Sequence, residues 1–115
     1  MSGVTNKMEH CIELCETCHG ACVETITHCL KMSGAHSKLD HIRLMWDCAE
    51  ICALAADFMH RGSDYYFRTC AVCAEICARC ADDCARFEND PIMRRCAEAC
   101  RNCASACQEM AAIHA

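Results

Sequence analysis

The chain contains one proline, four glycines and few large aliphatic or aromatic side chains. Small secreted disulfide scaffolds are rich in loops, so this scarcity of proline and glycine argues against that class. Leu, Ile, Val and Phe together number only 18 of the 115 residues, or about 16%, which is too little for an ordinary hydrophobic core. If the chain folds, another residue type must supply the core volume.

Long apolar runs are also missing. The first residues, MSGVTNKMEHC, contain no apolar run of the signal-peptide type, so no secretory leader is expected. No stretch approaches the roughly 18 uncharged apolar residues of a membrane span, and no membrane partner is expected. The formal net charge is −5, which disfavours nucleic acid and anionic lipid surfaces as partners.

Cysteine is the residue that the chain has in abundance. It occupies 16 of the 115 positions, about 14%, which is above the roughly 8–10% at which cysteine content indicates a class of protein. Free cysteine behaves as a small buried hydrophobic residue, so it can supply the missing core volume.

Turn signals divide the chain into four helical segments. Breaks are expected at Ser33-Gly34, at Arg61-Gly62 and at Asn89-Asp90-Pro91, where Asp90 suits the N-cap and Pro91 the first helical position. Ser37 and Asp40 resemble a capping box at the start of the second segment. Short loops join antiparallel neighbours, so we predict an all-α, antiparallel, up-down four-helix bundle that forms a single domain over residues 1–115. The predicted helices span residues 4–32, 38–61, 64–88 and 91–113.

The cysteines follow a helical period. Their spacing is dominated by steps of three and four residues, which places side chains in one stripe along a helix and makes that stripe the inner seam of a bundle. Random placement would scatter them over all faces. The sequence therefore predicts a thiol-lined interior. The cysteines on the four seams are Cys11, Cys15, Cys18, Cys22, Cys29, Cys48, Cys52, Cys70, Cys73, Cys77, Cys80, Cys84, Cys96, Cys100, Cys103 and Cys107.

Sixteen inward thiols have several conceivable uses. As plain core residues they would be a poor choice, because Leu or Ile buries more apolar area. Disulfides within a stripe fit poorly, since Cβ atoms one helical turn apart are separated by about 5–6 Å and a bridge needs about 3.8 Å. A thiol redox enzyme needs one exposed cysteine pair of low pKa and not a buried column. Metal binding remains, and we expect no enzymatic activity.

The ligand type narrows the choice of metal. Thiolates favour Cu(I), zinc and Fe–S clusters, but Fe–S clusters usually take cysteines from loops. Zinc needs four ligands per ion, so the sixteen thiols would hold about four ions. Cu(I) accepts two or three thiolates, and one thiolate can bridge two ions. The capacity then approaches roughly one ion per thiol. Cu(I) is the favoured cargo; a zinc or general soft-metal buffer is the alternative, and a thiol redox reservoir is a more distant one.

The dense CxxxC pattern on four consecutive segments resembles the copper storage proteins, which are four-helix bundles with inward cysteines. The resemblance lies in four runs that span nearly the whole chain: CIELCETCHGAC, CAEICALA, CAVCAEICARCADDC and CAEACRNCASAC. It implies storage of many Cu(I) ions per chain in bacteria, and assembly into a homotetramer. Because no signal peptide is expected, it implies the cytosolic branch and a cytoplasmic location.

The second segment departs from this pattern, because it has only two cysteines, Cys48 and Cys52. His41 and Met45 occupy the preceding seam positions. Imidazole and thioether groups are reasonable Cu(I) ligands, so both residues join the candidate metal ligands, and the end of the bundle that carries them is the expected copper mouth. Copper capacity beside this segment is expected to fall below the thiol count.

A second apolar stripe runs along the first two segments. It includes Val23, Ile26 and Leu30 on the first and Leu54 on the second. An apolar face that is not needed for the core more often marks association, so a homo-oligomer is expected.

Overall fold

A computed structural model of the protein describes residues 3–114, so residues 1, 2 and 115 of the predicted domain lie outside it. Within residues 3–114 there are four α-helices and one short 3-10 helix, and the order along the chain is α1, η1, α2, α3, α4. Their bounds are α1 Gly3–Lys31, η1 Gly34–Ser37, α2 Leu39–His60, α3 Tyr66–Ala85 and α4 Pro91–His114.

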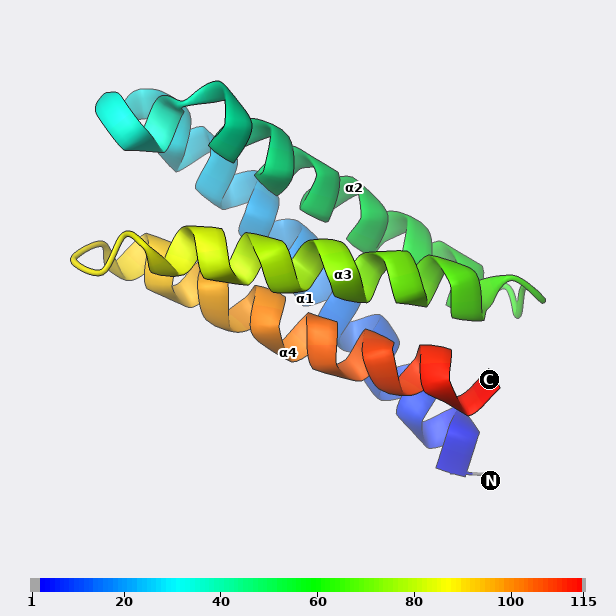
Figure 1. The fold of residues 1–115 in the computed structure, drawn as a ribbon. Coiled ribbons are helices and arrows are strands. Elements are labelled where there is room, and N and C mark those ends of the chain that lie inside the picture. Colours follow the sequence, from blue (N-terminus) through cyan, green and yellow to red (C-terminus); the bar gives the residue numbers. More distant parts are fainter. Residues whose placement is uncertain (1–2, 115) are drawn as a thin grey trace.

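The helices form an antiparallel bundle in which each helix packs against two neighbours. Helix α1 contacts α2 and α4, and α3 contacts the same two helices from the opposite side. The described chain measures 47 × 20 × 20 Å. Figure 1 shows η1 and the α3–α4 loop at one end of the bundle and both termini with the α2–α3 loop at the other. The predicted up-down four-helix bundle is therefore confirmed.

Two of the predicted helix ends have the expected capping geometry. The Oδ1 atom of Asp90 accepts hydrogen bonds from the amides of Ile92 and Met93 at 3.0 and 3.5 Å, which makes Asp90 the N-cap of α4. Gly62 has a φ of +63° beyond the end of α2, in the left-handed region that glycine adopts without strain. The amide of Ser63 donates to the carbonyl of Phe58 at 3.0 Å, completing a Schellman motif.

The predicted capping box at the start of the second helix is wrong. The Oγ atom of Ser37 donates to the carbonyl of Gly34 at 3.3 Å, so it closes the η1 turn and does not cap α2. Lys38 occupies the N-cap position of α2 without a side-chain cap. The loop between the first two helices is therefore itself a turn of 3-10 helix, which the spacing of Ser37 and Asp40 does not reveal.

Helix α3 is shorter than the predicted 64–88. At its start the amide of Tyr65 donates to Ser63 Oγ at 3.1 Å, so a side-chain turn precedes the helix. At its end the amides of Arg86 and Phe87 donate to carbonyls only three residues back, and the chain tightens out of the α-helix.

The core is made mainly of sulfur-bearing side chains. Every one of the sixteen cysteines is at most 1% exposed, and Met45, Met93 and Met110 are fully buried. Among the described residues, the only Leu, Ile, Val or Phe in the buried core is Ile26. Cysteine therefore supplies the core volume that the composition lacks.

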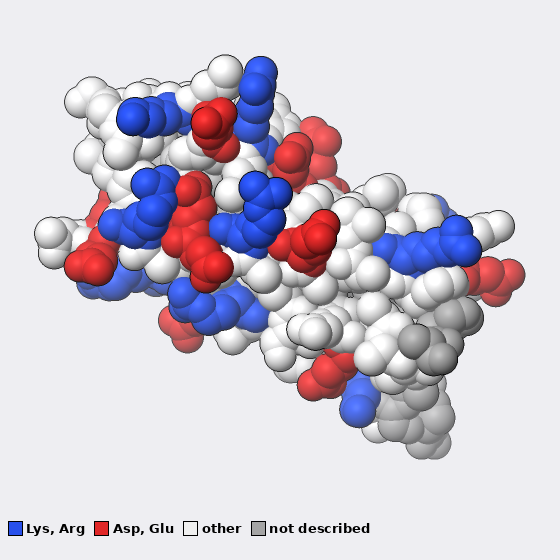
Figure 2. Space-filling view, in the orientation of Figure 1, with Lys and Arg blue, Asp and Glu red and all other residues white. Residues whose placement is uncertain are grey.

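Charged side chains of both signs lie on the surface. On the face shown in Figure 2, Lys and Arg side chains are interspersed with Asp and Glu side chains, without a large region of one sign. Within the described residues, no helix is both long enough and apolar enough to cross a membrane.

Candidate metal centre

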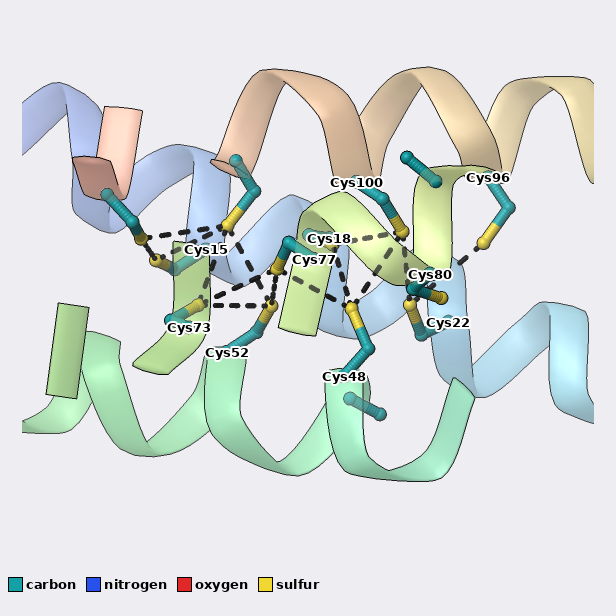
Figure 3. Close-up of a cluster of buried hydrophobic side chains, with 14 of the residues drawn as sticks. Cys15, Cys18, Cys22, Cys48, Cys52, Cys73, Cys77, Cys80, Cys96 and Cys100 are labelled. Carbon is teal, nitrogen blue, oxygen red and sulfur yellow. Dashed lines mark hydrogen bonds between the residues drawn. The ribbon is translucent and has the colours of Figure 1, made fainter. Parts of the chain in front are cut away.

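The cysteine sulfurs form a continuous column along the bundle axis. Starting at one end, Cys11 Sγ lies 3.6 Å from Cys107 Sγ, which lies 3.5 Å from Cys15 Sγ. The path goes on through contacts of 3.5–3.9 Å and ends at Cys22 and Cys96. Figure 3 shows labelled sulfurs of this path, among them those of Cys15, Cys48 and Cys100, pointing into the space between the helices. In order along the path, the sulfurs between Cys15 and Cys22 are those of Cys103, Cys52, Cys77, Cys48 and Cys100.

Most of these contacts join two different helices. Within one helix, the CxxxC pairs Cys73–Cys77 and Cys103–Cys107 approach to 3.7 and 4.0 Å. All sixteen cysteines are free thiols. The distances are those of van der Waals neighbours and far above the roughly 2.05 Å of a disulfide bond. The column is thus a set of neighbouring ligands drawn from all four helices.

The two cysteines of α2 occupy the middle of the column. Cys48 Sγ lies within 3.5–3.9 Å of three sulfurs, those of Cys18, Cys77 and Cys100. Cys52 Sγ also lies within 3.5–3.8 Å of three sulfurs, those of Cys73, Cys77 and Cys103, and it shares Cys77 with Cys48. The helix with the fewest cysteines therefore supplies two of the most connected thiols.

The thiols also form overlapping groups of possible metal ligands. In several sets of four, all sulfurs lie within 4.8 Å of one another, and these sets share members. Cys18 and Cys48, for example, belong both to a set with Cys22 and Cys100 and to a set with Cys52 and Cys77. Shared thiols suit a metal that accepts bridging thiolates, since separate tetrahedral sites would compete for the same sulfurs.

Burial keeps an isolated thiol of this interior neutral. Cys29, at the end of the column, is fully buried, and its desolvation, followed by nearby negative groups, raises its pKa to about 11. A Cu⁺ ion that binds such a thiol replaces one proton, so the net charge of the core does not change. The same bundle can therefore hold the empty and the filled column without burying a net charge.

Cys29 has imidazole and thioether neighbours in place of other thiols. Its Sγ lies 3.3 Å from His41 Nε2 and 3.6 Å from Met93 Sδ. His41 is buried, and its Nδ1 hydrogen-bonds to Asp83 Oδ2. Burial raises the pKa of the Asp83 carboxyl, but the hydrogen bonds from His41 and Arg86 outweigh this effect and lower it overall. A carboxylate behind an imidazole fixes the orientation of the ring toward its ligand.

The structure places the imidazole of His41 against the thiol of Cys29. Met45 is fully buried one turn further along α2. Two thioethers lie within hydrogen-bonding distance of a thiol: that of Met93 is 3.6 Å from Cys29 Sγ, and that of Met59 is 3.7 Å from Cys70 Sγ. These two methionines cap the two ends of the column. The sequence places both methionines on inner seams near helix ends, and this position could have predicted that they lie at the ends of the column.

The comparisons with known proteins agree with this geometry. A family model described as "Copper storage protein" matches residues 4–112. The "Uncharacterized cysteine-rich protein YhjQ" of Bacillus subtilis is 44% identical over 68 residues, which span 59% of this chain and 63% of that relative.

Two solved structures share the whole fold. "Cu(I)-bound Copper Storage Protein BsCsp3" is 40% identical with a TM-score of 0.85, and the match covers 91% of this chain and 98% of that one; its apo form is described as coming from Bacillus subtilis. A "cytosolic copper storage protein from Streptomyces lividans", described with five coppers, is 36% identical with a TM-score of 0.87 over 95% of both chains. With a thiol column through all four helices and a family match over almost its entire length, this chain belongs to the copper storage protein family.

Proposed function

We propose that this protein stores many Cu(I) ions in its thiol column. All sixteen cysteines act as ligands, and His41 and Met45 contribute at the end where Cys29 lies. The observation that carries the proposal is the unbroken path of sulfurs 3.5–3.9 Å apart between Cys11 and Cys96. Bridging Cu(I) ions can occupy such a path at a density near one ion per thiol.

The test is an anaerobic Cu(I) titration of the reduced protein in competition with a chelator of known affinity. The column predicts saturation above about eight ions per chain, because each thiolate serves more than one ion. Saturation near four, with zinc displaced only slowly, would instead support the zinc buffer. Thiol counting on freshly isolated metal-free protein addresses the redox reservoir, which requires most cysteines to be oxidised.

Sequestration, and not catalysis, is the activity that the burial of the thiols supports. A nucleophilic or redox-active cysteine must reach its substrate, whereas all sixteen are at most 1% exposed. The cargo must therefore be small enough to pass between helices or through an end of the bundle. A metal ion without its water shell, transferred from a donor, is small enough. We further propose that residues 1–115 act as one domain.

We also propose that the protein is a homo-oligomer, a tetramer by family resemblance, and that it works in the cytoplasm. The first proposal is supported by an apolar surface patch on α1 and α2, in which Val23, Leu30 and Trp46 are 45%, 57% and 53% exposed. Together with His19 and Ile26, these side chains line a shallow hollow of about 430 Å³. A second copy of this chain would bury the patch. The cytoplasmic location is supported by the Streptomyces relative, which is described as cytosolic.

A further inference from the structure

A second cluster of ligand-type side chains lies outside the thiol column. His28 of α1, His36 of η1 and Asp90 at the start of α4 meet at the end of the bundle that carries η1 and the α3–α4 loop. The Nε2 atom of His28 lies 2.8 Å from Asp90 Oδ2, and the Nε2 atom of His36 lies 2.9 Å from the same oxygen. We call these three residues the His28–His36–Asp90 cluster.

The two oxygens of Asp90 have different partners. Oδ1 accepts the amides of Ile92 and Met93 and caps α4. Oδ2 faces the two imidazoles and takes no part in the cap. Capping alone would need neither histidine, so the convergence of two ring nitrogens on this one oxygen requires a separate explanation.

We propose that the His28–His36–Asp90 cluster is a binding site for a divalent transition-metal ion of the zinc class. Two imidazole nitrogens and one carboxylate oxygen are the ligand set that such ions accept, and three protein ligands leave a position open for water. Bonds of about 2.0–2.2 Å at angles between 90° and tetrahedral separate two ligand atoms by about 2.8–3.6 Å. The observed 2.8 and 2.9 Å lie at the short end of that range, so small shifts would admit the ion.

The surroundings hold the rings in place and leave one side open. The ring of His36 lies 4.3 Å from the ring of Phe87, and the rings of His28 and His36 meet edge to face at 5.7 Å. The three side chains of the cluster are 16–22% exposed. His36 and Asp90 also line a surface hollow of about 450 Å³, together with Met32, Arg86, Phe87 and Pro91 among others. Water and a hydrated ion therefore have access.

The proposed site is chemically distinct from the copper column although it lies near its end. Phe87 stands between the two, because its ring also packs against His41 at 5.0 Å, and His41 contacts Cys29. The cluster contains no sulfur, and soft Cu(I) prefers the thiolates nearby. An ion in the cluster would tie α1, η1 and the start of α4 together beside the end of the column where Cys29 lies.

The test uses Cu(I)-saturated protein, so that the thiols are occupied, and Co(II) as an anaerobic spectroscopic probe. We expect about one equivalent of Co(II) to bind with ligand-field bands but without sulfur-to-cobalt charge transfer, and Zn(II) to displace it. Asp90→Asn retains a capping side chain but removes the carboxylate, and His36→Gln removes one imidazole. Each should weaken Co(II) binding by at least about tenfold.

The matched control is His60→Gln, which removes an exposed imidazole that lies 3.2 Å from Glu16, away from the cluster. This variant should bind Co(II) like the wild type. No Co(II) bound to the Cu(I)-saturated protein, sulfur-to-cobalt bands, or equal binding by wild type, Asp90→Asn and His36→Gln would each overturn the proposal. The copper content of the same samples is measured separately, so a failure of copper storage gives a different result from a failure of the divalent site.

Discussion

His41 Nε2 lies 3.3 Å from Cys29 Sγ, at the point where the thiol column gives way to imidazole and thioether groups. His41→Leu fills this buried position with an apolar side chain and removes the imidazole ligand. We expect the total Cu(I) capacity to fall by at most about one ion, because one of many soft ligands is lost. The rate of Cu(I) removal by an external chelator should change several-fold, since His41 stands at the end of the path. Stopped-flow extraction checks this, with His60→Leu as the control; identical rates in all three proteins would refute a role for His41 in transfer.

The central position of Cys48 leads to a second prediction. Cys48 contacts three other thiols, whereas Cys29 contacts a histidine and a methionine. Cys48→Ala should therefore reduce the Cu(I) stoichiometry by more than one ion, about two, and Cys29→Ala by about one or less. Metal analysis after anaerobic loading and gel filtration measures both. Equal losses would mean that the ions are not bridged through the middle of the column.

Proton release on loading follows from burial. Because the pKa of Cys29 is raised to about 11, its thiol is protonated at neutral pH and must lose its proton when copper binds. For each proton displaced, the apparent Cu(I) affinity should rise about tenfold per pH unit, up to the pKa of the thiol, and should fall as the solution is acidified. Titration in weak buffer should release close to one proton per Cu(I) ion. Release of no protons at pH 7 would show that the empty column is already ionised.

The metal-free protein should remain folded, because the thiols themselves form the core. Cys77 is fully buried and lies 3.5 Å from both Cys48 and Cys52. Cys77→Ser places a hydroxyl among weak hydrogen-bonding partners, so we expect a loss of about 1–3 kcal/mol in the free energy of unfolding. Urea unfolding of reduced, metal-free protein, followed by circular dichroism, measures this, with Cys77→Ala as the apolar comparison. A coil spectrum for the metal-free wild type would contradict the premise.

Charged substitutions in the apolar patch on α1 and α2 should break the proposed oligomer into monomers. Leu30 and Trp46 are both more than half exposed, and a second copy would cover them. Leu30→Asp combined with Trp46→Glu places charges in that contact, so the assembly should dissociate to monomers at micromolar concentration. Sedimentation velocity checks this. The Cu(I) capacity per chain should be unchanged, because neither residue reaches the column.

The period of the cysteines was enough to predict the bundle and its lining. Steps of three and four leave no other face for the thiols, and turn residues such as Asp90 and Gly62 mark where helices end. Which sulfurs meet across helices could not be predicted, because that depends on the rotation and axial offset of each helix. The contacts of Cys29 with His41 and Met93, and of His41 with Asp83, bring together residues from all four helices.

The predicted capping box failed for a local reason. Ser37 and Asp40 have capping-box spacing, but the hydroxyl finds a closer partner in the η1 turn. The seam that Met45 shares with His41 also does not reveal that Met93, on α4, has its thioether against the thiol of Cys29. The His28–His36–Asp90 cluster brings together residues up to 62 positions apart around one carboxylate oxygen. No short sequence motif predicts this cluster.

The complete burial of the thiols has a consequence for how the filling state could be recognised. If each Cu⁺ ion replaces one proton on a side chain that is at most 1% exposed, we expect neither the charge nor the outline of the molecule to change as it fills. A full and an empty molecule should migrate together in a native gel under reducing conditions, although the full one is heavier by the mass of its copper.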